Sequence, residues 1–466
     1  MSSRSEAPLA ALTLRGGAYL AARYGLGVLV SLGNMLVLTW WIGPHAYGLF
    51  VTTIALTSFL ANLARAGVDT YLVRQPENPD AHLYSVATTV VLANSLFLMT
   101  VGAAAAPWLI RWFGSREFLA PYLVLLLNVP MVGLTGIPMA KLERALNFGA
   151  AAGIELGGQI LALIVSMTLA AGGFGIWAPV SGQLAWQAVV LAATCVSARL
   201  LPHLRFDRPA AKEMLAYGIG ITASIRVWQL RTLVNPLLVG RFVGAEGVAF
   251  VGVAVRIAEG LGSVRMAAGR IAIAALARLQ QHHERMQLAL QRALCLQLIT
   301  LGPLLCTFAL LGPWIVPRFL GARWMPSLTV FPFIAVGVLV NSVYNLQSSA
   351  LFVMGRPWVV TRACAVHVVL LAGGSWVFLR FGISGYGWAE LLACAAYIVI
   401  HAGLSKILTI SYRVLGPWLA VFTAGLFARG RYGVWALGFL VLYGAGFVGW
   451  QVFCRGRQRL VPQEQS

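Results

Sequence analysis

The chain has 466 residues, of which 59% are hydrophobic and only 10% are charged, whereas soluble proteins usually carry about 25% charged residues. This composition excludes a soluble globular protein and predicts an all-α, polytopic membrane protein. The net charge of +20 does not indicate a nucleic-acid partner, because most Lys and Arg lie in short joints between apolar runs, as the positive-inside rule predicts.

About fourteen apolar segments are long enough to cross a bilayer as helices. The first six are expected at 16–42, 46–70, 84–110, 119–140, 150–172 and 174–198. After a basic joint, six more are expected at 214–242, 246–267, 288–312, 325–354, 358–379 and 384–408, and two further segments at 414–428 and 432–453 close the chain. Lys and Arg gather in the joints on the side of the N-terminus, which predicts that both termini lie in the cytoplasm.

The two halves of the chain resemble each other. The shift that superimposes Asn235 on Asn34 also superimposes Gly244 on Gly43, and further along PWLIRWFG resembles PWIVPRFLG. Because each half has an even number of segments, both enter the membrane in the same direction, which makes the repeat parallel. We therefore expect two six-helix lobes, 1–200 and 201–410, with the substrate path between them, and two C-terminal helices with a basic tail at 411–466. The alternative is that apolar helices resemble one another without a repeat.

Charged residues inside the apolar segments need an explanation, because inserting one such side chain at the bilayer centre costs roughly 2.5 to 3.5 kcal/mol of free energy. Arg226 and Arg231 lie about 140° apart round a helix, so they cannot both face one point, and one of them is expected to pair with a carboxylate. Arg256 and Glu259 are three residues apart and either pair with each other or face a cavity. Arg65 and Asp69 are expected to form a structural pair.

Three segments resemble a known family: LRGGAYLAARYGLGVLVSLGNMLVLTWWIGPHAYGLF at 14–50, Gly321–Trp324 after PWIVPRFL, and LQSSALFVMGRP at 346–357. They are similar to polysaccharide and O-antigen flippases of the Wzx type, which share a superfamily with lipid II flippases and MATE multidrug exporters. The resemblance implies a V-shaped, two-lobed bundle whose central cavity opens to each side in turn and moves polyprenyl-diphosphate-linked oligosaccharide outward. It also implies a location in the bacterial inner membrane, and membrane lipid, glycosyltransferases and a polymerase of the same pathway as partners. Arg23 resembles the cavity arginine in the first helix of lipid II flippases.

The candidate site residues follow from this substrate. Arginine binds phosphate oxygens in pairs, Trp stacks on sugars, and Asn either hydrogen-bonds a sugar or packs between helices. The substrate-binding candidates are Arg23, Asn34, Arg226, Trp228, Arg231, Asn235 and Arg256. Glu155, Glu259 and Glu390 are ion-coupling candidates, although a capping or interfacial role is favoured for Glu155 and Glu390. Other tryptophans, Trp40, Trp41, Trp108, Trp112, Trp314 and Trp324, are expected in the belts at the membrane interfaces.

No motif indicates a cofactor, a metal or a catalytic residue. The six cysteines stand singly, and there is no Walker loop. The hypothesis is therefore a non-enzymatic flippase. A MATE-like, ion-coupled exporter of small molecules is the first alternative, but its cationic substrates would favour a carboxylate rather than Arg23 in the first helix. An O-antigen polymerase or ligase is the second, but such an enzyme usually needs a larger outer loop than any joint here provides.

Overall fold

The structure, a computed structural model, describes residues 6–200, 203–263 and 283–428. Within these ranges the chain forms helices and no strands, as a lipid environment demands, because a helix satisfies its own backbone hydrogen bonds. Nine of the described helices are long and apolar enough to cross a membrane. The predicted all-α, polytopic fold is confirmed, with a helix at each expected segment up to residue 428; the segment at 432–453 lies outside the described residues.

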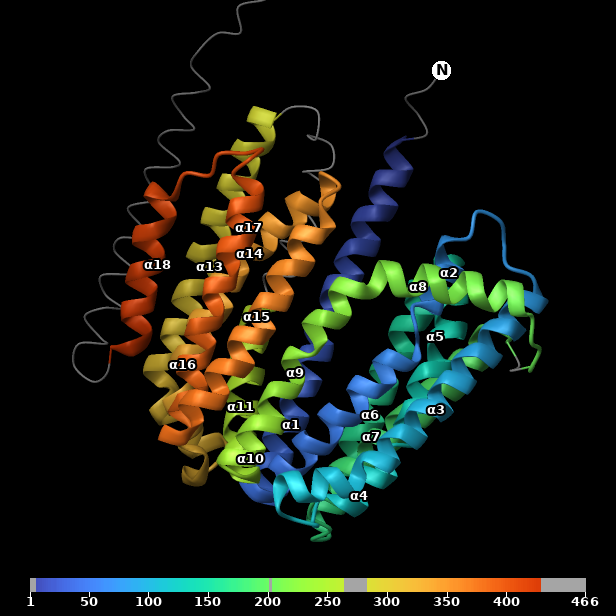
Figure 1. The fold of residues 1–466 in the computed structure, drawn as a ribbon, viewed down its shortest axis with the longest axis horizontal. Helices are drawn as coiled ribbons and strands as arrows, with labels where there is room; N and C mark the ends of the chain where they lie inside the picture. Colours follow the sequence, from blue (N-terminus) through green and yellow to red (C-terminus); the bar gives the residue numbers. More distant parts are fainter. Residues whose placement is uncertain (1–5, 201–202, 264–282, 429–466) are drawn as a thin grey trace, which may run out of the picture.

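The helices from the first half of the chain gather on one side of the molecule (Figure 1). α1 (Glu6–Ala64) contains both of the first two expected segments, and its backbone leaves the helical conformation at Gly43, which precedes Pro44. The other elements are α2 (Val68–Arg74), α3 (Ala81–Phe113), α4 (Leu119–Leu125), α5 (Asn128–Arg144), α6 (Phe148–Ala171) and α7 (Trp177–Ser197). We call α1 to α7 the first lobe.

The second lobe begins with a nearly continuous helical stretch made of α8 (Arg208–Gln229), α9 (Arg231–Val234), the π-helix η1 (Asn235–Val239) and α10 (Gly240–Phe242). Pro236 lies in the π-helical turn, where its missing N–H prevents regular α-helical bonding. The remaining elements are α11 (Ala245–Gly262), α13 (His283–Phe319), η2 (Ala322–Trp324), α14 (Ser327–Val353), α15 (Pro357–Phe378), η3 (Leu379–Phe381), α16 (Ser384–Ala393), η4 (Cys394–Ala396), α17 (Tyr397–Leu404) and α18 (Tyr412–Phe427).

The two glycines matched in the sequence repeat share one backbone conformation. Gly43 has φ 77° and ψ 171°, and Gly244 has φ 89° and ψ −177°. This region is essentially open to glycine alone, and each glycine stands just before the second long helical segment of its lobe. The shared conformation supports the internal repeat; the lobe boundaries at 200/201 and 410/411 stay a prediction.

The lobes converge where α1, α10 and α4 meet, at the bottom of Figure 1. There α1 and α11 touch backbone to backbone: a Cβ atom added to Gly48 would lie 1.8 Å from the carbonyl oxygen of Ala245. Trp324 on η2 donates from Nε1 to the Thr39 carbonyl over 3.1 Å, and Arg323 donates to the carbonyls of Thr39 and Trp40. We call this region the closed end.

A second set of hydrogen bonds lies at the same closed end. Arg241 on α10 donates from Nη1 to the Trp112 carbonyl over 2.7 Å. Trp112 on α3 in turn donates from Nε1 to the Leu237 carbonyl over 2.9 Å, and its ring stacks on Trp376 of α15. All three contacts join one lobe to the other, so separating the lobes here would break them together.

One expected interface tryptophan has a different role. Trp108 and Trp314 are 56% and 82% exposed and fit a lipid-facing belt, but Trp324 is 0% exposed. Its ring lies edge-on against Tyr47 of α1 and Phe250 of α11. The interface prediction for Trp324 is therefore wrong, because the neighbouring lobe covers a residue that sequence position alone places at the membrane surface.

At the opposite end of the molecule α8 crosses the first lobe, over α2 and α5 (Figure 1). A Cβ atom added to Gly218 would lie 2.2 Å from the Ala66 carbonyl oxygen, at the turn between α1 and α2. The chain then continues through α9 into the second lobe. The α8–α9 stretch therefore links the two lobes away from the closed end.

Candidate functional site

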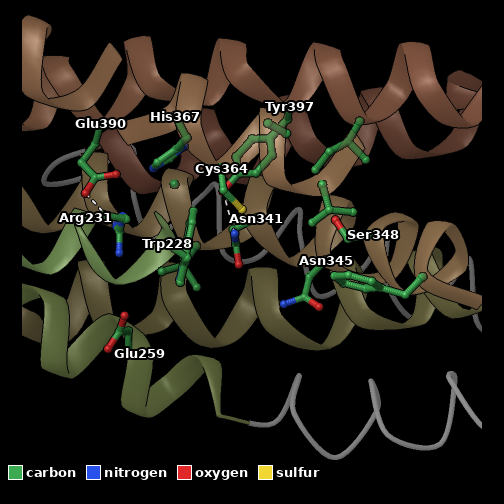
Figure 2. Close-up of a pocket in the computed structure, with 16 residues that line it drawn as sticks. Trp228, Arg231, Glu259, Asn341, Asn345, Ser348, Cys364, His367, Glu390 and Tyr397 are labelled. Atoms are coloured by element: carbon green, nitrogen blue, oxygen red, sulfur yellow. Dashed lines mark hydrogen bonds and ion pairs between the residues drawn. The ribbon is translucent and has the colours of Figure 1, made fainter. Parts of the chain in front are cut away.

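A polar cavity of about 370 Å³ lies inside the second lobe. Residues from α8, α9, α11, α14, α15, α16 and α17 converge on it, so it exists only once the lobe has folded (Figure 2). Its polar and aromatic lining consists of Trp228, Arg231, Glu259, Asn341, Asn345, Ser348, Phe352, Cys364, His367, Glu390 and Tyr397.

Arg231 and Glu390 form a buried ion pair at one end of this cavity. Nη2 of Arg231 donates to Oε1 of Glu390 over 2.7 Å, and the two side chains are 19% and 1% exposed. The Tyr386 hydroxyl donates to the same oxygen over 3.1 Å. The capping or interfacial role favoured for Glu390 is therefore wrong: α16 packs between α14 and α15, which removes this carboxylate from the membrane surface. Arg231 is the arginine that pairs with a carboxylate.

Aromatic rings line the cavity next to this pair. The guanidinium of Arg231 lies 5.4 Å from the ring centre of Trp228, within the range of cation–π attraction. The ring of His367 lies 5.1 Å from Trp228 and 5.5 Å from Tyr397. Tyr397 stacks on Tyr344 with nearly parallel planes. The cavity therefore offers several ring faces beside its amides and charges.

A second polar cavity, of about 480 Å³, lies in the first lobe. Its charged lining residues are Arg65, Asp69, Arg74, Glu143 and Glu155, with Trp186 beside them. Arg65 and Asp69 approach to 4.0 Å, which agrees with the expected structural pair. Nε of Arg65 also donates to the Val132 carbonyl over 3.3 Å.

Arg226 has a different charged neighbour from Arg231, although both lie on the same helical stretch. Its Nη2 atom is buried and makes no hydrogen bond, and the carboxylate that acts on it electrostatically is Asp69 of α2. The prediction that Arg226 and Arg231 face different points is confirmed. Their separation round the helix gives each guanidinium a different carboxylate neighbour, Asp69 of the first lobe for Arg226 and Glu390 of the second for Arg231.

The two matched asparagines lie in the helix packing. Nδ2 of Asn235 donates to the Val248 carbonyl over 3.3 Å, which ties η1 to α11. Oδ1 of Asn235 and Oδ1 of Asn34 are buried without a hydrogen bond. Asn235 thus has at least a packing role, which was one of the two alternatives.

The remaining candidates are spread along α11 and α1. Arg256 and Glu259 are both exposed, and the structure records no ion pair between them. Arg256 acts electrostatically on Tyr47 of α1, and Glu259 lines the cavity of the second lobe. Arg23 belongs to α1, but its side chain lies outside the described part of the structure.

Sequence reasoning missed most of the second-lobe cavity. Asn341, Asn345 and Ser348 lie on α14, His367 lies on α15 and Tyr397 on α17. The available signal was the polar run NSVYNLQSS inside an apolar segment, because polar groups at membrane depth usually face a cavity or a partner.

Comparison with known proteins agrees with this architecture. A family model described as polysaccharide biosynthesis protein matches residues 37–329. The succinoglycan biosynthesis transport protein ExoT of Rhizobium meliloti (strain 1021) is 22% identical over 73% of this chain and 74% of its own length.

Among solved structures, the lipid II flippase MurJ in an inward closed conformation has a TM-score of 0.78 at 14% identity, covering 94% of this chain and all of that one. An inward-facing multidrug resistance MATE family transporter of the MOP superfamily has a TM-score of 0.61 at 16% identity, covering 82% and 95%. These likenesses confirm the fold that the sequence resemblance implied. The chain is thus a multi-pass membrane protein with the fold of the MOP superfamily, and it belongs to the polysaccharide biosynthesis protein family.

Proposed function

We propose that this protein is a flippase that moves polyprenyl-diphosphate-linked oligosaccharide from the cytoplasmic to the outer leaflet of a bacterial inner membrane. The observation that carries the proposal is the position of Arg226: a buried guanidinium atom without a hydrogen bond, on the helix that links the two lobes. A diphosphate supplies the paired oxygen acceptors that arginine binds best. Family membership and the succinoglycan transport relative support a polysaccharide substrate.

The proposed movement is alternating access between the lobes. In the described state, Arg323, Trp324 and Arg241 tie the lobes together at the closed end, which we place on the outer side. The substrate enters from the side of the N-terminus, its diphosphate binds toward Arg226, and release outward requires these contacts to break. Glu155, Glu259 and Glu390 are the candidates for coupling this movement to the flow of an ion.

A MATE-like exporter of small molecules is the alternative within the same fold. Arg226, whose buried Nη2 atom lacks a hydrogen bond, and the exposed Arg256 disfavour the cationic substrates of such an exporter by charge repulsion. The family match to polysaccharide biosynthesis proteins also disfavours it. We therefore retain the lipid-linked oligosaccharide as the substrate.

Gene deletion and complementation test this function. Cells that lack the protein should lose surface polysaccharide and accumulate lipid-linked oligosaccharide in the inner leaflet. Arg23→Ala, Arg226→Ala and Arg256→Ala should each fail to restore polysaccharide while reaching the membrane at normal levels. Arg208→Ala, at the exposed start of α8, is the matched control and should restore it. Full polysaccharide in all three test variants would refute the cationic path.

A further inference from the structure

The charges of the second-lobe cavity do not suit a diphosphate. Arg231 is its one described cation, and Glu390 neutralises it over 2.7 Å. Glu259 adds a second carboxylate at the exposed side of the same cavity. The cavity therefore carries formally more negative than positive charge, which repels phosphate.

The cavity also holds polar atoms that lack partners. His367 is 3% exposed and points into the cavity toward Trp228 (Figure 2). Neither of its ring nitrogens makes a hydrogen bond of normal geometry, although the backbone of Ala393 interacts with it. Nε of Arg231 is likewise buried without a hydrogen bond. Since buried polar groups are normally satisfied, these atoms indicate a ligand or water with several hydrogen-bonding groups.

The volume of the cavity suits one small ring. Its volume of about 370 Å³ lies at the lower end of the range of roughly 300 to 1,000 Å³ for small-molecule sites. Glu390, His367 and Tyr397 form a buried floor, whereas Asn345 and Phe352 are exposed at the mouth. The aromatic faces of Trp228 and Tyr397 offer apolar surface to the C–H groups of a ligand, while amides and hydroxyls on α14 offer hydrogen bonds.

We propose that this cavity is a subsite for one uncharged sugar residue of the transported oligosaccharide, separate from the diphosphate position near Arg226. The inference rests on the proposed function and adds to it that each lobe binds a different part of the substrate. In this arrangement Arg231 is held by Glu390 and donates its remaining N–H groups to sugar hydroxyls. The substrate therefore spans both lobes, with its charged end on the first lobe and a sugar in the second.

Binding to the purified full-length protein in lipid nanodiscs tests the subsite with two probes. One is the lipid-linked oligosaccharide extracted from the deletion strain, and the other is undecaprenyl diphosphate without sugar. The test variants are Asn345→Leu and Trp228→Leu. Their matched controls are Thr329→Val, an exposed polar residue elsewhere on α14, and Trp358→Leu, an exposed tryptophan on α15.

Each test variant should weaken binding of the oligosaccharide lipid by about tenfold and leave binding of undecaprenyl diphosphate unchanged, which also shows that the variant is folded. The controls should bind both lipids like the wild type. Equal loss of both lipids, or no loss of either, would overturn the sugar subsite. If the wild type binds neither lipid, the proposed function itself fails, which is a different result.

Discussion

Arg226 and Arg231 belong to one helical stretch, yet Arg231 is bonded to Glu390 of the second lobe whereas Arg226 interacts electrostatically with Asp69 of the first. The stretch is therefore coupled to one carboxylate in each lobe. Any movement of the lobes relative to each other must change the surroundings of at least one of these arginines. We therefore expect that binding of a charged substrate near α8 and α9 changes the position of one lobe relative to the other.

The Arg231–Glu390 pair should show strong coupling in stability measurements. Removing one partner of a buried pair leaves an uncompensated charge, at a cost of about 3 to 5 kcal/mol, whereas replacing both with apolar groups costs much less. We expect Arg231→Met and Glu390→Leu each to lower the melting temperature in detergent more than the double variant does.

The exposed pair His45–Glu117 is the control for that experiment, since its side chains are 57% and 63% exposed. Glu117→Gln should leave the melting temperature nearly unchanged, because exposed pairs contribute little. If the double variant Arg231→Met/Glu390→Leu falls by the sum of the single effects, the two residues are not coupled and the pair does not hold α9 to α16.

Gly48 should be intolerant of any side chain, because its α carbon lies against the Ala245 carbonyl. Gly48→Ala should push α1 from α11, lower the melting temperature and reduce complementation. Gly33→Ala, on the same helix with open space at its Cβ position, should be neutral or slightly stabilising by roughly 0.4 to 1 kcal/mol. Normal stability of Gly48→Ala would show that the lobes do not pack this closely.

The repeated glycines should behave alike in the two lobes. Ala at position 43 or 244 must adopt positive φ with extended ψ, at a cost of about 1 to 3 kcal/mol. We expect Gly43→Ala and Gly244→Ala to lower stability by similar amounts, and Gly153→Ala, in open space on α6, to have little effect. A large loss at one position with none at the other would contradict structural equivalence.

Much of the fold could be predicted from the sequence because apolar length and charge reflect the bilayer directly. The separation of Arg226 from Arg231 followed from helix geometry, and the Gly43–Gly244 match followed from residue order. The environments of Glu390, Trp324 and His367 could not be predicted this way. Each depends on which helix packs beside it: the neighbours of His367 come from α8 and α17, and those of Trp324 from α1 and α11. A single helix reveals neither.

The hydrogen bonds of Arg323 should determine how often the closed end opens. Arg323→Ala removes its bonds to the Thr39 and Trp40 carbonyls. A net loss of about 1 kcal/mol would raise the open population roughly fivefold. The reporter is Val51→Cys, because Val51 of α1 packs against Gly252 of α11. Its labelling by a membrane-impermeant maleimide added to intact cells measures opening toward the outer side, after subtraction of labelling in cells without the reporter.

Arg318→Ala is the matched control, since Arg318 is an exposed arginine in the last turn of α13, five residues before Arg323. We expect faster labelling of the reporter in Arg323→Ala and unchanged labelling in Arg318→Ala. Equal acceleration in inverted membrane vesicles, where the maleimide reaches the inner side, would indicate general loosening rather than opening. An unchanged rate in Arg323→Ala would show that the α1–α11 backbone contact and the Trp324 hydrogen bond keep this end closed without Arg323.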